Sequence, residues 1–127
     1  MKSNCSVGEI RILKKVVSNE DLATFETGNV HPFYSTFSLG RDVEWACRQF
    51  VLEMKDENEE GIGTFVNILH KSPAKIGEKV LFTATVKSII RNEIICTITA
   101  ETVGRVIAEI ETGQKILSKE KLKTLLS

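Results

Sequence analysis

Three side chains of the sequence carry the groups that acyl transfer requires: a hydroxyl, a carboxylate and an imidazole. They belong to Thr36, Glu44 and His70. Glu44 lies in a helical row of small and apolar residues, where a carboxylate is either desolvated or faces a cleft. His70 ends an apolar strand face just before a turn, and Thr36 stands at a predicted helix start. A hydroxyl, an acid and a base around an apolar cleft can activate a nucleophile and move a proton.

Each of these residues also has a structural interpretation, which the sequence leaves open. A carboxylate at the edge of an apolar stripe can simply reach solvent. A histidine at a strand end is often structural, and a hydroxyl at a helix start usually caps the helix. Gly63 indicates either close backbone packing or the close approach of a ligand. The dipeptide His31-Pro32, in the segment before the helix, is a flap element or a plain turn.

The elements that must position these groups follow from hydrophobic periodicity. Apolar residues at helical spacing predict one long helix over residues 35–54. Alternating patterns predict strands over 63–70, 80–91, 94–101 and 106–117, with a tight turn at Asn92-Glu93. A further strand is expected over 9–17, a long turn-rich loop over 19–34, and a short basic helix over 118–126.

This element order predicts an α+β fold. An antiparallel sheet with one apolar face needs a cover, and only one long helix is available. The economical architecture is a hotdog fold, in which an antiparallel sheet of about five strands wraps around one long central helix. We expect residues 1–127 to form a single hotdog domain, since the length fits one core.

Composition excludes several functional classes. Seventeen basic and 17 acidic residues give zero net charge, which argues against nucleic-acid and membrane-surface partners. No apolar run approaches the roughly 18 residues of a membrane span, and no secretory signal is visible. Three scattered cysteines predict reduced, buried thiols, so we expect a cytoplasmic protein. No metal site is expected, and the nucleophile-elbow, Walker and dinucleotide-binding motifs are absent.

Longer motifs resemble a known family. The run YSTFSLGRDVE over residues 34–44, the strand GTFVNILH over 63–70 and the segment SPAKIGEKV over 72–80 are its landmarks. Together they resemble the fluoroacetyl-CoA thioesterase-like branch of the hotdog superfamily. In that family a glutamate follows the helix-opening threonine by eight positions, and the histidine follows by thirty-four. Thr36, Glu44 and His70 reproduce both spacings.

The resemblance implies an acyl-CoA thioesterase that hydrolyses a short acyl-CoA thioester to the free acid and CoA. Glu44 would activate water or attack the thioester carbonyl. Thr36 would orient that nucleophile or attack in its place, and His70 would polarise the thioester or shuttle a proton. The sequence departs from the family at Phe37, where relatives commonly carry proline. An alternative is a non-catalytic hotdog module that binds an acyl-CoA or a related ligand.

Further residues are expected to bind the substrate. The backbone near Gly63 would approach the acyl group, and Phe37 would also contact the substrate. The cations Arg41, Lys71 and Lys75 lie near the motifs and would hold the CoA phosphates. No cofactor is expected besides CoA as part of the substrate. One helix and about five strands are too few to enclose an acylated CoA, so we expect a homodimer with sites shared across the interface.

Overall fold

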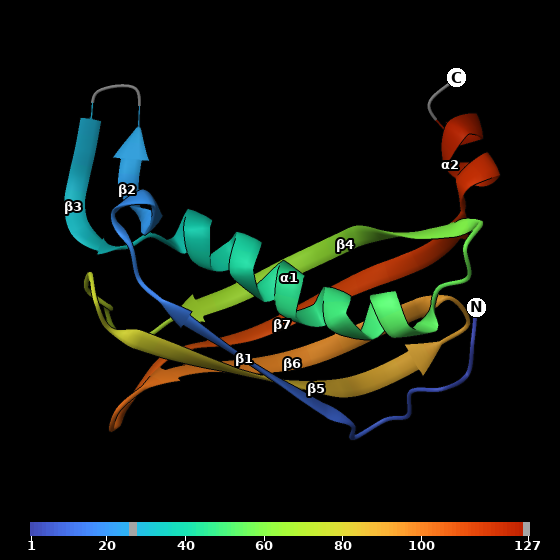
Figure 1. The fold of residues 1–127 in the computed structure, drawn as a ribbon, viewed down its shortest axis with the longest axis horizontal. Helices are drawn as coiled ribbons and strands as arrows, with labels where there is room; N and C mark the ends of the chain where they lie inside the picture. The colour runs from blue at the N-terminus through green and yellow to red at the C-terminus, as the bar shows by residue number, and fades with distance from the viewer. Residues whose placement is uncertain (26–27, 126–127) are drawn as a thin grey trace.

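The computed structural model describes residues 1–25 and 28–125. Its long helix, α1, lies across one face of a curved sheet, and a small hairpin and a short C-terminal helix rise on either side of it (Figure 1). The elements run in the order β1 Ile10–Val16, a 3-10 turn Asn19–Asp21, β2 Leu22–Phe25, β3 Gly28–Tyr34, α1 Thr36–Met54, β4 Glu59–His70, β5 Lys79–Ile90, β6 Glu93–Thr102, β7 Arg105–Ser118 and α2 Lys119–Leu125.

The central helix forms where its periodicity predicts. Its N-cap is Ser35, whose side chain accepts a hydrogen bond from the Ser38 N–H at 3.0 Å. Thr36 therefore does not cap the helix, which is one of the roles that the sequence left open for it. The apolar residues whose helical spacing predicted α1 are buried, and so are Cys47 and Val51 beside them. This face of α1 packs into the concave side of the sheet.

The main sheet has five antiparallel strands in the order β1-β5-β6-β7-β4. The predicted inward faces of β5 and β6 are buried against α1. The turn between these strands falls at Arg91-Asn92, one residue earlier than predicted, and Arg91 adopts a positive φ of 56°. β4 and β1 form the two edges, so one side of β4 has no strand partner among the described residues.

The segment expected as a loop over residues 19–34 contains the β2–β3 hairpin instead. Four of its residues, Asp21, Leu22, Ala23 and Tyr34, are buried, and Phe33 forms an isolated bridge with Lys75. The hairpin is thus anchored at its base on the helix start and on the segment before β5. Within the described residues, no helix is long and apolar enough to cross a membrane.

Candidate active site

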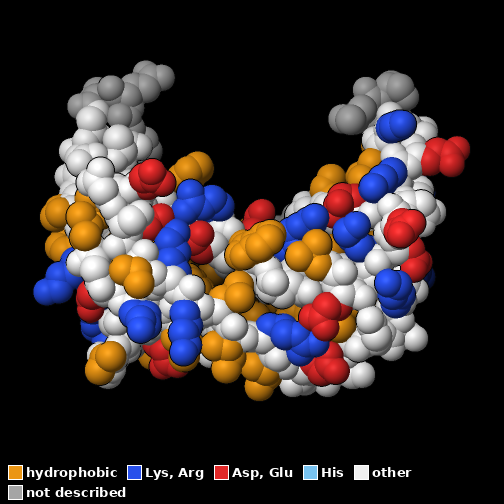
Figure 2. All heavy atoms as spheres, in the orientation of Figure 1, with side chains coloured by type: hydrophobic (Ala, Val, Ile, Leu, Met, Phe, Trp, Pro, Cys, Tyr) orange, Lys and Arg blue, Asp and Glu red, His pale blue; other side chains and the backbone are white. Residues whose placement is uncertain are grey.

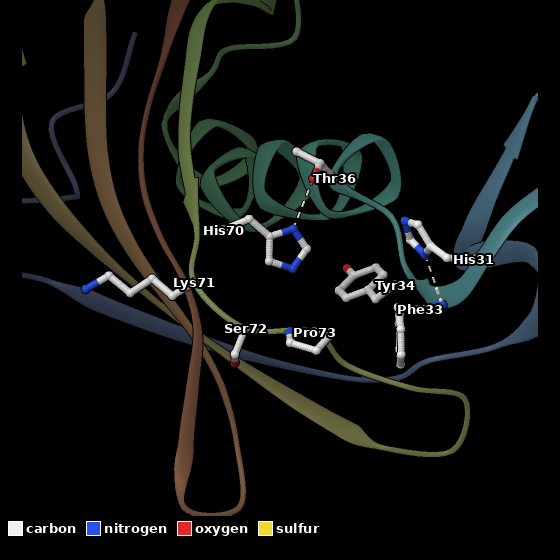
Figure 3. Close-up of a pocket in the computed structure, with 8 residues that line it drawn as sticks. All are labelled: His31, Phe33, Tyr34, Thr36, His70, Lys71, Ser72 and Pro73. Carbon is white, nitrogen blue, oxygen red and sulfur yellow. Dashed lines mark hydrogen bonds between the residues drawn. The ribbon is translucent and has the colours of Figure 1, made fainter.

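Thr36 and His70 meet at the N-terminal end of α1. Thr36 Oγ1 lies 3.0 Å from His70 Nδ1, a hydrogen bond in which either group can be the donor, depending on the histidine tautomer (Figure 3). Strand alternation puts Ile68 and His70 on the same face of β4, and a Cβ built on Gly40 would lie 3.6 Å from Ile68 Cδ1. The close approach of helix and strand at Gly40 therefore brings His70 under the first turn.

The other nitrogen of His70 is left without a partner. Nε2 is buried and makes no hydrogen bond within the described part of the chain. Burial lowers the pKa of His70 below its ordinary value of 6.5, a nearby backbone group of Ser72 raises it, and positive charge on His31 lowers it. The net direction is downward, so the imidazole is neutral near pH 7. A neutral imidazole with a free nitrogen can donate or accept a proton at that atom.

Both residues line a pocket of about 350 Å³ under the β2–β3 hairpin. Figure 3 shows the lining side chains arriving from β3, the start of α1 and the end of β4. The lining residues are His31, Phe33, Tyr34, Thr36, His70, Lys71, Ser72 and Pro73. Their rings form much of the wall, and the Thr36–His70 pair and His31 lie on opposite sides of it in Figure 3.

A partly buried charge network holds the hairpin side of this pocket. Tyr34 is 1% exposed and its hydroxyl donates to Asp42. Lys15 Nζ bridges Asp21 Oδ1 at 2.7 Å and Asp42 Oδ2 at 2.6 Å, and Arg41 contacts both carboxylates. Burial and the bond to Asp42 raise the pKa of the Tyr34 phenol far above its ordinary value of 10.0. The ring is therefore a neutral, fixed wall of the pocket.

Glu44 lies elsewhere on the helix. Eight residues at 1.5 Å each separate it from Thr36 by about 12 Å along the axis. Its side chain is exposed, and a Cβ built on Gly63 would be 3.4 Å from Glu44 Oε1. A second hollow contains Glu44 and Gly63 together with Arg41, Trp45, Arg48, Gly61 and Gln114. Within one chain, the structure pairs Thr36 with His70 and Glu44 with Gly63.

The other residues predicted to bind the substrate lie apart from one another. Phe37 is 83% exposed and lines a different pocket, between α1 and the hairpin. Arg41 is engaged with Asp21 and Asp42, as described above. Lys71 Nζ pairs with Glu109 Oε2 at 3.0 Å and points away from the pocket in Figure 3. Lys75 is exposed and lines a neighbouring hollow that shares Phe33 and Pro73 with the main pocket.

Two residues near these groups lie outside the predicted set. His31 is on β3 and lines the Thr36–His70 pocket, although the sequence left it between a flap and a turn. Gln114 is 4% exposed, and its Nε2 donates to the Glu44 backbone carbonyl at 3.0 Å. A polar residue on the inward face of β7 was the available signal for Gln114. No group of three or more potential metal ligands occurs among the described residues.

Comparison with known families decides the classification. The family model for fluoroacetyl-CoA-specific thioesterase matches residues 17–120. The chain belongs to this family. The predicted recognition and the predicted activity, hydrolysis of acyl-CoA thioesters, are thereby confirmed at the level of the family. The search of curated protein sequences gave no match.

Comparison with solved structures identifies the fold of this chain. A Thermus thermophilus hypothetical protein, described as a thioesterase superfamily member, has 32% sequence identity to this chain and a TM-score of 0.90. The match covers 95% of this chain and 90% of the Thermus thermophilus chain. A mutant of the fluoroacetyl-CoA-specific thioesterase FlK with fluoroacetate and CoA is 19% identical with a TM-score of 0.86, over 93% and 99%. A hot-dog-like protein from Thermanaerovibrio acidaminovorans is 20% identical with a TM-score of 0.86, over 94% and 89%. The predicted hotdog fold is confirmed.

Proposed function

We propose that this protein hydrolyses a short acyl-CoA thioester to the free acid and CoA at the Thr36–His70 pocket. The observation that supports this proposal best is the Thr36–His70 contact, with a buried and unpartnered Nε2, in a member of a thioesterase family. CoA arrives as part of the substrate, and the proposal needs no cofactor. The thioester carbonyl would lie within reach of His70 Nε2.

The proposed chemistry uses neutral His70. When Thr36 Oγ1 donates to Nδ1, the ring proton is on Nε2, which then donates to the thioester carbonyl oxygen and polarises it. Glu44 takes a proton from water, and the oxygen of that water adds to the carbonyl carbon. The C–S bond then breaks, the acid is released, and the proton passes to the CoA thiolate.

Glu44 joins this reaction from a second copy of the chain. Its 12 Å offset from Thr36 along the helix separates the two within one protomer. A two-fold axis passing beside Gly40, which is four residues from each, sets Thr36 of one copy opposite Glu44 of the other. Such an arrangement makes two identical sites, each completed by the partner subunit.

The edge strand β4 supports the same axis. Antiparallel pairing of two β4 strands about Asn67, with the bulge between Gly63 and Phe65 taking up one residue, sets His70 of one copy opposite Gly63 of the other, and Gly63 lies beside Glu44. Asn67 directly precedes Ile68, the residue that Gly40 approaches. The helix register and the strand register therefore agree on one two-fold axis.

The surfaces around this axis have the composition of an interface. β4 exposes apolar side chains along its unpaired edge region: Ile62, Phe65, Val66 and Leu69. Figure 2 shows hydrophobic and positively charged side chains gathered over α1, in the hollow between the hairpin and α2. The exposed apolar residues of α1 are Phe37, Trp45 and Leu52. Burial of these residues in a homodimer would remove a large apolar patch from water.

Substrate contacts and location complete the proposal. Phe37 and the Gly63 backbone would contact the acyl end across the interface. Lys75, beside the pocket mouth, would contact the CoA phosphates together with Arg41 and Lys71, once these exchange their carboxylate partners for phosphate. We assign the protein to the cytoplasm, because its three cysteines are free and buried, as is common in reducing compartments.

Three substitutions test the proposed site. Thr36→Ala, Glu44→Gln and His70→Ala should each lower kcat/KM for thiol release by roughly 10² to 10⁴-fold, the range for loss of a proton-transfer group. Thr97→Ala on the outer sheet face and Glu120→Gln on α2 are matched controls and should keep full activity. Wild-type activity in both Glu44→Gln and His70→Ala would refute the site assignment. Binding of CoA esters without any hydrolysis by the wild type would favour the alternative of a non-catalytic binding module.

A further inference from the structure

Several polar groups in the pocket wall are already engaged. The Tyr34 hydroxyl donates to Asp42, behind the wall. Ser72 Oγ donates to the Val106 carbonyl at 2.8 Å, on the strand beyond. Neither hydroxyl is free to donate to a ligand unless it gives up its present acceptor. The wall on this side therefore offers mainly ring and backbone surface.

The remaining lining residues further reduce the number of side chains that can form a hydrogen bond with a ligand. Lys71 is paired with Glu109 and directed away from the cavity (Figure 3). Thr36 and the Nδ1 atom of His70 are paired with each other. Of the side chains that line the pocket in the described structure, two keep an uncommitted polar atom: His70, at Nε2, and His31. The proposed function uses His70 for the thioester carbonyl, so His31 is left to meet another part of the substrate.

The orientation of His31 is set by its own backbone. Nδ1 accepts a hydrogen bond from the Phe33 N–H at 3.2 Å, and the two rings pack with centroids 5.7 Å apart. An accepting Nδ1 means that the neutral ring carries its proton on Nε2. In Figure 3 the ring faces the pocket from the hairpin side, with its second nitrogen turned away from the Phe33 backbone. His31 therefore presents an N–H donor to the cavity, on the side across from His70.

We propose that His31 is a specificity-determining residue that donates a hydrogen bond to an oxygen on the acyl group. The preferred substrates are then short acyl-CoA thioesters whose acyl group bears a hydroxyl, keto or carboxylate oxygen, rather than plain alkyl acyl-CoAs. This inference rests on the proposed function, because it needs the acyl group to lie in this pocket. A plain alkyl group would leave the His31 donor without a partner when the bound substrate displaces water. No carboxylate of the same chain lines the pocket, so like charge near an anionic acceptor comes only from Glu44 of the partner subunit.

Matched pairs of substrates test this assignment. Glycolyl-CoA and propionyl-CoA differ by a hydroxyl in place of a methyl group, and malonyl-CoA and isovaleryl-CoA differ by a carboxylate in place of an isopropyl group. In His31→Leu the preference of kcat/KM for the oxygen-bearing member of a pair should fall about tenfold, as expected for one lost hydrogen bond. His31→Gln keeps an N–H donor and should retain most of the preference. The pair that responds identifies the hydroxyl or the carboxylate as the natural acceptor. An equal loss for both members of each pair, or no change, would overturn the proposal.

A binding measurement separates this inference from the proposed function. The chain has only two histidines, so its imidazole NMR spectrum contains two sets of signals, which His31→Gln assigns. The probes are non-hydrolysable ketone analogues of glycolyl-CoA and propionyl-CoA, with a methylene group between sulfur and carbonyl. Both should shift the His70 signals, and only the hydroxyl-bearing analogue should shift those of His31. Unchanged His31 signals, or equal shifts with both probes, would overturn the role of His31 even if hydrolysis is confirmed. Absence of hydrolysis with the selective His31 shift would overturn only the catalytic proposal.

Discussion

Complementation between two inactive variants measures whether each site is shared by two chains. One variant carries Glu44→Gln and the other His70→Ala. In the proposed homodimer, a mixed dimer contains one site with both groups intact, because His70 comes from the first variant and Glu44 from the second. Its other site lacks both groups. If instead a site used Glu44 and His70 of one chain, every site in the mixture would lack one group.

The expected magnitude follows from the geometry. Thr36 and Glu44 lie about 12 Å apart along α1, so a single chain does not bring them together around one carbonyl. Random reassociation of equal amounts of the two variants makes half of the dimers mixed, and half of the sites in those dimers intact. The mixture should therefore regain about one quarter of wild-type activity per site in a two-fold dimer.

The assay is thiol release after subunit exchange. The two variants are unfolded together, refolded and compared with each variant refolded alone. A mixture of His70→Ala with the doubly substituted chain is the control, and it should stay inactive because no site can regain His70. Activity in the mixed sample equal to the sum of the separate variants, with dimers confirmed by sedimentation, would refute the shared site.

Three further predictions concern the chemistry and the packing. Because burial lowers the pKa of His70 below 6.5 and the reaction needs its neutral form, the acid limb of the kcat/KM profile should be centred below pH 6.5; an acid limb centred above 6.5 would contradict this. Tyr34→Phe removes a buried hydrogen bond to Asp42 and should lower the unfolding free energy by about 1.5–3 kcal/mol in urea titrations. An unchanged urea midpoint would show that this hydrogen bond does not stabilise the fold. In Gly61→Ala the new Cβ would lie 2.6 Å from Cγ1 of buried Val51, so calorimetry should show a destabilisation of about 1–3 kcal/mol. An unaltered Tm would mean that β4 shifts to accommodate the methyl group at no cost in stability.

The long elements were predictable because their burial follows one simple period. α1 and the strands from β4 to β7 bury whole rows of side chains, so a spacing of 3.6 or of two residues is visible in the sequence. The β2–β3 hairpin lacks such a row. It is short, most of β3 is exposed, and its buried residues Leu22, Ala23 and Tyr34 lie together at its base. Gly28 and Pro32 then make the segment look like a loop.

The site was predictable in part, and for a different reason. Thr36 and His70 are thirty-four residues apart, and before the fold was known they were joined by the expected packing of helix on strand in a hotdog fold and by the family spacing. The outward direction of Lys71 was available from strand alternation, because it follows inward-facing His70. The pairing of Arg41 with Asp21, by contrast, depends on how the hairpin base packs against α1. The role of His31 likewise depends on a backbone contact inside the hairpin.

The most direct test of the central claim is the rate of CoA thiol release by the purified protein across acyl-CoA esters of graded length and polarity. We expect saturable turnover with short acyl groups, a fall in kcat/KM as the acyl chain outgrows the pocket, and loss of this turnover in His70→Ala. If the esters raise the Tm of the wild type and yet release no thiol at any concentration, the claim of catalysis at this pocket is contradicted.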